Sequence, residues 1–322
     1  MPDAGNSTPV LLCNGGGMKF LAVLNRDGGT LRTTDLPAFS ERMRRTLEAA
    51  GHRLSVKIVG SQEIASALDK VATAKGGDVV LVGGGDGTIS SAAARLMGKD
   101  KALAILPAGT MNLFARSLGI PQNLDAAVQA FAAGEIVAVD IASANGQPFV
   151  HQFSIGMHAK MVRIREKMDF GSRLGKIRAS ARAAWATINN PPAMSVTLTI
   201  GEAEVLTRAS GIGVTNNLFG ENHLPYADDP AGGILGIYVT MTRQRGELMR
   251  FFFNMARGKW RDNQHVEIHQ ADKAVLDIGS ASGKLSAVLD GELIRLERRT
   301  AFEIHARTLK VLVPPKDENA AA

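Results

Sequence analysis

The sequence has one cysteine, few aromatic residues and no long apolar segment. Because Cys13 is the single cysteine among 322 residues, no disulfide can form within the chain, and a reducing compartment is its natural environment. No stretch approaches the roughly 18 uninterrupted apolar residues of a membrane-spanning helix, and the first 17 residues lack a basic leader. These absences predict a cytoplasmic protein that has no membrane anchor of its own.

The charge excess is modest, with 37 basic against 31 acidic residues and a net charge of +6. Basic residues gather in the segment 160–182, where only Glu166 and Asp169 oppose them and apolar residues are interleaved. Such a segment can lie on an anionic membrane surface, although most charge runs are solvated helix faces. Since this segment lacks Tyr and Trp and no nucleic-acid-binding module is recognisable, we expect no nucleic-acid partner.

Strand and helix patterns alternate through the first 139 residues. Apolar strands are expected at 18–24, 54–59, 79–82 and 103–106, and helices at 37–50, at 61–74 with Ser61 as its N-cap, and at 123–133. This alternation predicts an α/β domain with a doubly wound parallel sheet, in which ligands bind beyond the carboxyl ends of the strands.

From residue 135 onward short strands replace this alternation. They are expected at 137–141, 149–155, 194–200, 205–214, 234–241, 266–269, 274–278, 285–289 and 302–304, with helices at 157–188 and 246–257. The change predicts a β-rich, antiparallel second domain with its boundary near Asp140. Within the second helix, Phe251, Phe252 and Phe253 fit a lipid entrance or, more commonly, ordinary core packing.

Two glycine-rich turns follow buried strands. The first contains Gly84, Gly85, Asp86, Gly87 and Thr88, and the second contains Gly109, Thr110 and Asn112. Each turn brings backbone amides and a helix N-terminus to the end of a strand, where they favour an anion. Two phosphate-sized sites beside one carboxylate indicate a nucleotide. The P-loop and the dinucleotide fingerprint are both disfavoured, because no Gly-Lys pair is followed by Ser or Thr and Ser90 stands where a third glycine is needed.

At these residues the sequence resembles a known family. Gly84-Gly85-Asp86-Gly87-Thr88, followed by Pro107-x-Gly109-Thr110-x-Asn112-x-Phe114-Ala115-Arg116, is similar to the catalytic domain of diacylglycerol kinases, sphingosine kinases and bacterial lipid kinases. The turn Asn25-Arg26-Asp27-Gly28-Gly29 and the late Asp290-Gly291-Glu292 resemble two further motifs of that family. The resemblance extends from about Met18 to about Val313.

The resemblance implies an ATP-dependent lipid kinase. It implies a nucleotide-binding domain of NAD kinase/diacylglycerol kinase type at 1–139, with 307–322 returning to it, and a β-sandwich for the acceptor lipid at 140–306. ATP would lie in the cleft between the domains, against Asn25 and the two glycine turns. Asp86 and Glu292 would hold Mg²⁺, and Asp290 would take the proton of the acceptor hydroxyl, with Glu292 beside it. The partner would be a lipid such as diacylglycerol or a sphingoid or ceramide lipid, met at a membrane surface, and a homo-oligomer is compatible with this reading.

Three departures from the family pattern leave alternatives open. Leu113 occupies a position that is often a carboxylate, Arg26 replaces a proline, and Gly232-Gly233-Ile234-Leu235-Gly236 replaces a loop with two aspartates. A kinase of a soluble acceptor such as NAD and a nucleotide-binding module without catalysis are therefore also considered, as is an ordinary hairpin turn at Asp290-Gly291. A serine hydrolase is disfavoured because no histidine is placed by sequence to serve Ser154.

Overall fold

The computed structural model describes residues 17–168, 173–259, 263–281 and 286–315. Two compact units divide the chain: the first runs up to Val139 and includes the segment from Arg307 onward, and the second comprises Asp140–Ala306. Among the described residues, no helix is both long enough and apolar enough to cross a membrane.

A parallel sheet forms the centre of the first unit. Its strands are β1 (Lys19–Asn25), β2 (Arg53–Val59), β3 (Val79–Gly84), β4 (Ala102–Pro107) and the C-terminal part of β16 (Arg299–Val313). Their order is β2-β1-β3-β4-β16, and each neighbouring pair is parallel. Val311 of β16 pairs with Leu103 of β4, so the C-terminal part of β16 lies in the sheet of the first unit.

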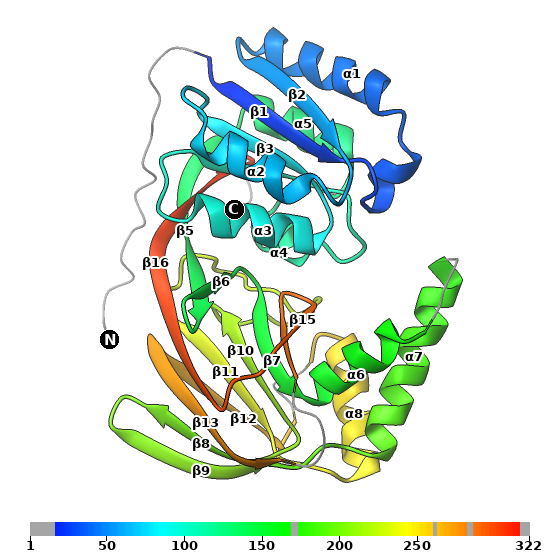
Figure 1. The fold of residues 1–322 in the computed structure, drawn as a ribbon, viewed down its shortest axis with the longest axis vertical. Coiled ribbons are helices and arrows are strands. Elements are labelled where there is room, and N and C mark those ends of the chain that lie inside the picture. Colours follow the sequence, from blue (N-terminus) through cyan, green and yellow to red (C-terminus); the bar gives the residue numbers. More distant parts are fainter. Residues whose placement is uncertain (1–16, 169–172, 260–262, 282–285, 316–322) are drawn as a thin grey trace, which may run out of the picture. The chain divides into compact units, whose positions relative to one another are not determined.

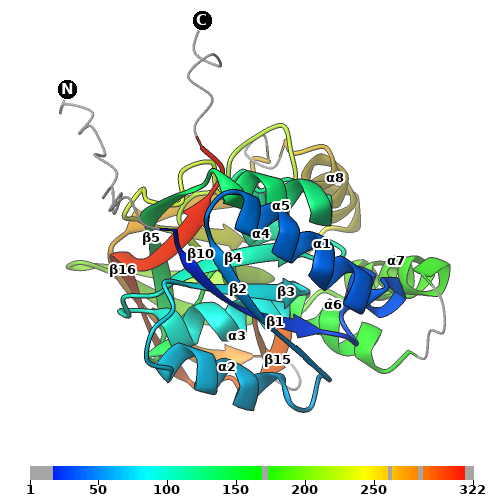
Figure 2. The ribbon, with the colours of Figure 1, turned by 90° about the horizontal axis from the view of Figure 1, so that it is seen from above.

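Helices cover both faces of this sheet. They are α1 (Leu36–Ala49), α2 (Ile64–Thr73), α3 (Asp86–Leu96), α4 (Leu113–Ser117) and α5 (Leu124–Ala132), with a 3-10 turn η1 at Gly29–Thr33. Figures 1 and 2 show α1 and α5 on one face and α2 and α3 on the other. All residues of β3 and β4 are buried, as expected for parallel strands covered on both sides. The predicted doubly wound α/β domain is therefore confirmed.

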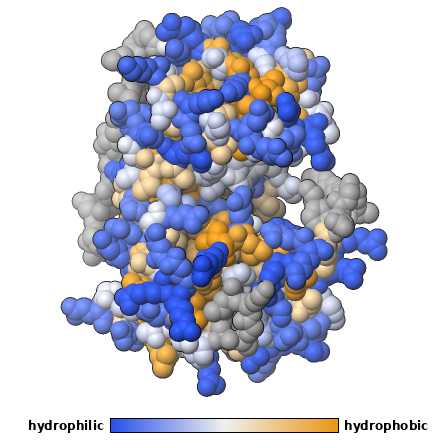
Figure 3. All heavy atoms as spheres, viewed as in Figure 1, coloured by the Kyte–Doolittle hydropathy of each residue, from blue (hydrophilic) through white to orange (hydrophobic). Residues whose placement is uncertain are grey.

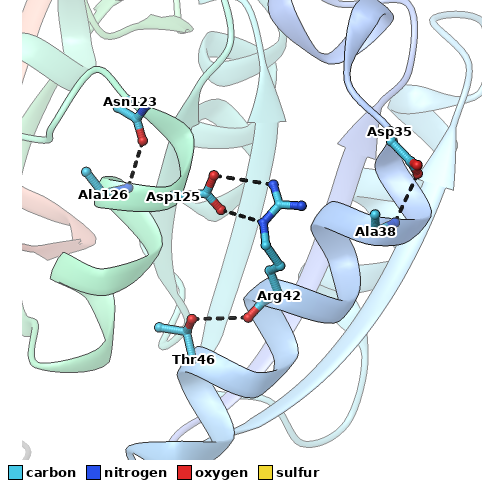
Figure 4. A network of polar contacts seen from close by, with 7 residues as sticks. All are labelled: Asp35, Ala38, Arg42, Thr46, Asn123, Asp125 and Ala126. Atoms are coloured by element: carbon cyan, nitrogen blue, oxygen red, sulfur yellow. Dashed lines mark hydrogen bonds and ion pairs between the residues drawn. The ribbon is translucent and has the colours of Figure 1, made fainter.

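The pair α1 and α5 illustrates how local signals start these helices (Figure 4). The side chain of Asp35 accepts the Ala38 amide, and that of Asn123 accepts the Ala126 amide, so each caps its helix N-terminus. Arg42 of α1 forms an ion pair with Asp125 of α5 at 3.1 Å. Both side chains are more than half exposed, so the pair adds little to stability, and the buried face of α1 holds the helix in place.

The second unit is a β-sandwich. One antiparallel sheet has the order β12-β11-β10-β7-β14-β15, and the other layer is β16-β13-β8-β9. The strands are β5 (Glu135–Ala144), β6 (Gln147–Phe149), β7 (Gln152–Gly156), β8 (Met194–Ile200), β9 (Ala203–Ala209), β10 (Gly211–Asn216), β11 (Leu235–Thr240), β12 (Val266–Ala271), β13 (Lys273–Ala281), β14 (Ala287–Leu289) and β15 (Glu292–Ile294). Phe153 of one layer and Phe302 of the other meet in the core with ring centroids 4.9 Å apart. The predicted β-rich sandwich is thus also confirmed.

Several expected boundaries in this unit are wrong. The expected helix 157–188 is two helices, α6 (Met157–Glu166) and α7 (Arg173–Asn189), while α8 (Arg245–Ala256) lies close to its expected bounds. The expected strands 149–155 and 205–214 each divide into two, at bends that turn the chain from one strand to the next. Conversely, the strand expected at 302–304 and residues 307–313 of the expected returning segment belong to the single strand β16.

Candidate functional site

Three turns meet at the carboxyl ends of the parallel strands in the first unit. β1 ends at Asn25, β3 at Gly84 and β4 at Pro107. Backbone hydrogen bonds tie the turns together, because the Thr30 amide donates to the Ala108 carbonyl at 2.8 Å and the Ala108 amide donates to the Gly84 carbonyl at 3.1 Å. The sheet therefore brings both glycine turns and the Asn25 turn into one site, as the strand order predicts.

Close packing explains three glycines of this site. A methyl group on Gly29, which has φ +40°, would lie 1.8 Å from the Ala108 carbonyl oxygen. One on Gly109 would lie 2.9 Å from the Gly85 Cα atom, and one on Gly84 would lie within 2.8 Å of the Thr88 side chain. These turns therefore require glycine for their own packing.

Gly85 is different, because the fold does not require a glycine there. Its φ of −86° suits any residue, and the nearest atom to an added methyl group would be the Gly109 Cα at an ordinary 3.6 Å. Gly85 is also the N-cap of α3, and its carbonyl accepts the Thr88 amide at 2.9 Å, so that the first two amides of the helix, those of Asp86 and Gly87, are the ones without an acceptor in the helix. A bare backbone at this position leaves space for a ligand to come close to those amides.

Asp86, the first residue of α3, links the two glycine turns. Its half-buried carboxylate accepts the Leu113 amide at 2.9 Å and the Asn112 amide at 3.2 Å, and so caps the short helix α4. Each oxygen thus receives one of these bonds and retains a lone pair. Within the described residues, no group of three or more His, Cys, Asp or Glu side chains could hold a metal. A Mg²⁺ ion here would therefore be held by Asp86, water and the phosphates of a bound nucleotide, which is the usual pattern for this ion.

Asn112 shapes the second glycine turn. It has a left-handed backbone with φ +50°, and its Nδ2 atom donates to the carbonyl oxygens of Pro107 and Gly109 and to Oε1 of Gln122. The side chain is buried and is occupied by the turn itself. Thr110, by contrast, is exposed at the turn, where its hydroxyl is accessible to a ligand.

Asn25 ties its own turn, which follows β1, to the first glycine turn. Its Nδ2 atom donates to Thr88 Oγ1 at 3.4 Å, and its Oδ1 atom accepts the Asp27 amide and the Ser61 hydroxyl. Ser61 is therefore not the N-cap of α2, which Glu63 occupies; it lies in the turn after β2 and its amide donates to Asp27 Oδ2 at 2.7 Å. Sequence reasoning missed Ser61 and Gln122 as site residues, and the position of Ser61 directly after a parallel strand was the available signal.

In the second unit, Asp290 and Gly291 form the two-residue turn of the β14–β15 hairpin. Both have positive φ, +45° and +90°, and Leu289 pairs with Glu292 across the turn. The buried Asp290 carboxylate also accepts three backbone amides, from Val150 at 2.9 Å, His151 at 2.9 Å and Gln152 at 3.0 Å. Asp290 thus anchors the β6–β7 bend through its carboxylate. Glu292, at the start of β15, is exposed.

Two neutral histidines adjoin this anchor. Burial lowers the pKa of His151 to about 3, and the neighbouring His158 lowers it further. Burial likewise lowers the pKa of His158 to about 4, with a further contribution from the charge of Arg165. His158 Nδ1 lies 2.6 Å from Ser154 Oγ, although sequence reasoning found no histidine for that serine. Ser154 is buried in the middle of the central strand β7, between β10 and β14, which leaves a nucleophile there no access to substrate.

The arrangement defines a class of protein: an α/β domain with a glycine-lined anion site, joined in one chain to a β-sandwich. Residues 19–144 match the family model described as the diacylglycerol kinase catalytic domain, and this stretch includes all the site residues of the first unit. The resemblance to the diacylglycerol and sphingosine kinase catalytic-domain family is therefore confirmed, and this match locates it in the first unit.

Curated relatives are named as lipid kinases. A "Probable lipid kinase YegS-like" of Citrobacter koseri is 41% identical over 103 residues, which are 31% of this chain and 34% of that protein. A "Probable lipid kinase YegS" of Escherichia coli is 39% identical over 105 residues, 31% of this chain and 35% of that protein. The matched region thus spans about a third of the length of these relatives.

The likeness in fold covers more of the chain. A crystal structure of a diacylglycerol kinase from Bacillus anthracis superposes with a TM-score of 0.69 and covers 92% of this chain and 97% of that one, at 20% sequence identity. The sandwich therefore has a counterpart in a solved structure, although identity at this level shows only that the fold is shared.

Proposed function

We propose that this protein is an ATP-dependent lipid kinase that transfers the γ-phosphoryl group to a hydroxyl of a lipid such as diacylglycerol or a sphingoid or ceramide lipid. The observation that carries the proposal is Gly85. Three other glycines of the site are required by close packing, whereas Gly85 has an ordinary φ and room for a methyl group. A glycine that the fold does not need, at the N-terminus of α3, supports close approach of a phosphate.

The first unit would bind the nucleotide. The amides of the first turn of α3 and the positive end of its dipole favour the phosphates, and Thr88 and Thr110 offer hydroxyl groups beside them. Asn25 fixes the turn that faces Thr88. Asp86 would hold the Mg²⁺ ion that accompanies ATP, with Glu292 as a proposed second carboxylate; when bound, this ion offsets the charge of the phosphates.

The second unit would supply the proton acceptor. During transfer, the acceptor oxygen forms a bond to the γ-phosphorus as the bond from that phosphorus to the bridging β-phosphate oxygen breaks, and ADP leaves. The hydroxyl proton would go to the carboxylate of Asp290. The three amides that bind this carboxylate hold it in one orientation, which would keep its position toward the acceptor fixed.

The partner would be a lipid at a membrane surface, reached from the cytoplasm by a peripherally associated protein. This acceptor fits the lipid-kinase names of the curated relatives, whose similarity covers about a third of this chain.

The proposal is tested by incubating the purified protein with γ-labelled ATP, Mg²⁺ and a total lipid extract in mixed micelles, followed by chromatography. We expect a labelled lipid with the wild type and no label with Asp86→Asn, which retains an oxygen to accept one of the two α4 amides. Labelling of NAD or another soluble acceptor in a parallel reaction, without any labelled lipid, would replace the lipid by a soluble acceptor. ATP binding without transfer to either would leave a nucleotide-binding module.

A further inference from the structure

Two helices of the second unit carry exposed large apolar side chains. Among the described residues, Trp185 of α7 is 60% exposed, and Met249 and Phe253 of α8 are 50% and 55% exposed. Figure 3 shows that hydrophilic side chains cover most of the face in view, with apolar surface confined to patches. The other exposed large apolar residues, Ile58, Met111 and Leu206, lie on separate elements, so the three on this one pair of helices indicate an interaction surface.

On α8 the exposed residues form one stripe. Arg245, Met249, Phe253 and Arg257 follow one another at intervals of four residues, so they lie on the same helix face, and each is exposed. The Arg257 guanidinium carbon lies 4.1 Å from the centroid of the Phe253 ring. This cation–π contact keeps the aromatic ring and the positive charge together at the surface.

On α7 the exposed residues have the same character. Arg178, Arg182 and Trp185 are exposed and follow at intervals of four and three residues. The two helices are joined one turn further along, where Ile188 of α7 packs against Leu248 of α8. Trp185 therefore lies about one turn from the contact between Ile188 and Leu248, and α7 and α8 pack together as one pair of helices.

The charged side chains that are exposed on these two helices are all basic. The α7 sequence contains no acidic residue, and the one acidic residue of α8, Glu247, lies 3.5 Å from His265 and is half-buried. The exposed faces thus carry arginines together with one tryptophan, one phenylalanine and one methionine. Arginine beside aromatic rings suits the boundary between anionic head groups and acyl chains, where amphipathic side chains bury their apolar part and leave the charge in contact with phosphate.

We propose that the exposed faces of α7 and α8 are a docking surface for an anionic lipid bilayer. The inference deepens the proposed function, in which the partner is a lipid at a membrane surface, and it rests on that function for its biological purpose. The sequence predicts a membrane contact along the whole basic segment 160–182. The proposed surface uses only the C-terminal end of that segment, together with α8. It also divides the phenylalanine cluster, because Phe251 and Phe252 are half-buried whereas Phe253 belongs to the surface.

Vesicle sedimentation and tryptophan fluorescence test this proposal without ATP, so the result does not depend on phosphoryl transfer. The probes are vesicles of phosphatidylcholine alone and of phosphatidylcholine mixed with phosphatidylglycerol. The full chain carries Trp260→Phe, which leaves Trp185 as the single tryptophan emitter. We expect binding to the mixed vesicles, weaker binding to the neutral ones, and a blue shift of Trp185 that brominated lipids quench.

Two variants and two matched controls locate the surface. Arg178→Glu/Arg182→Glu should weaken binding at least about 25-fold, since each basic residue near an anionic surface contributes about fivefold. Met249→Ser/Phe253→Ser should weaken it about tenfold or more through the lost apolar burial. The controls are Lys57→Glu on β2 and Leu206→Ser on β9, which remove an exposed charge and a 79% exposed apolar side chain elsewhere, and neither should change binding.

Equal loss of binding in the variants and their controls would overturn the proposal, as would binding that survives both variants. Sedimentation velocity without lipid tests whether the surface binds a second copy of the chain instead. A dimer that dissociates in Met249→Ser/Phe253→Ser would assign the surface to self-association. A kinase that is active on dispersed lipid but whose vesicle binding ignores these residues would leave the proposed function standing and the docking surface refuted. Vesicle binding that both variants weaken, without any kinase activity, would support the docking surface and refute the proposed function.

Discussion

At the scale of single residues, the structure shows which glycines of the site are required by the fold and which one is not. The sequence predicts that Gly84, Gly85 and Gly109 line an anion site, but it cannot separate their reasons. The structure separates them, because Gly109 packs on the Gly85 backbone while Gly85 itself has free space on its exposed side.

Gly85→Ala should leave the unfolding free energy within about 1 kcal/mol of wild type, because the new methyl group meets no close neighbour. Its KM for ATP should rise at least about tenfold, since the methyl group occupies the space of a phosphate. Gly109→Ala should instead destabilise the first unit, and Gly213→Ala, which also has open space around it, should change neither quantity. Denaturant titration and initial-rate kinetics measure both; an unchanged KM in Gly85→Ala would remove the main support for the nucleotide site.

His151 and His158 carry a pH dependence that the sequence does not reveal. Their pKa values in the folded protein lie near 3 and 4, below the ordinary value of about 6.5, because burial favours the neutral ring. The unfolded chain therefore binds these protons first as the pH falls, and stability is lost from about pH 6.5 downward until the folded pKa values are reached. Each histidine accounts for a loss on the order of 3 kcal/mol at about 1.4 kcal/mol per pKa unit.

Urea titrations between pH 7.5 and pH 4 measure this loss. His158→Gln should flatten the pH dependence, because it removes a ring whose pKa is lowered by burial. A stability profile that is flat over this range in the wild type would contradict the burial of both rings.

At the scale of elements, the sequence predicts the first unit better than the second. Buried parallel strands read as continuous apolar runs, so β3 and β4 were placed within two residues. The sequence does not predict the bends between β6 and β7 and between β9 and β10. The β6–β7 bend depends on Asp290, which comes some 140 residues later in the chain and binds the amides of that bend. The Ser154–His158 contact was missed because its spacing of four residues crosses a strand-to-helix junction.

The β14–β15 hairpin separates two roles for Asp290. Asp290→Asn removes the charge and places an amide group against an amide donor, which should cost about 1–3 kcal/mol and abolish transfer. Gly291→Ala strains the same turn, where φ is +90°, yet it retains the carboxylate. We expect Gly291→Ala to keep measurable kcat and Asp290→Asn to lose it, with ATP binding unchanged in both. If both variants lose activity to the same extent as they lose stability, Asp290 is only the anchor of the bend.

At the scale of the whole molecule, each unit has its own part in the proposed reaction. The first unit matches a kinase catalytic domain and has a glycine that its fold does not require, whereas the second offers an oriented carboxylate and an arginine-rich helical pair with exposed aromatic residues. The acceptor itself could not be predicted from sequence, since the residues that would read a lipid head group are dispersed over strands whose pairing is set by tertiary structure.

The central claim is phosphoryl transfer from ATP to a lipid hydroxyl, and the most direct measurement uses ATP whose γ-phosphate oxygens are all oxygen-18. The protein, Mg²⁺ and a lipid extract are incubated with this ATP, and the lipids are analysed by mass spectrometry. The account predicts a new lipid phosphate that carries three heavy oxygens and one ordinary ester oxygen from the acceptor, absent with Asp290→Asn. Labelled inorganic phosphate as the sole product, or a phosphorylated soluble compound instead of a lipid, would contradict it.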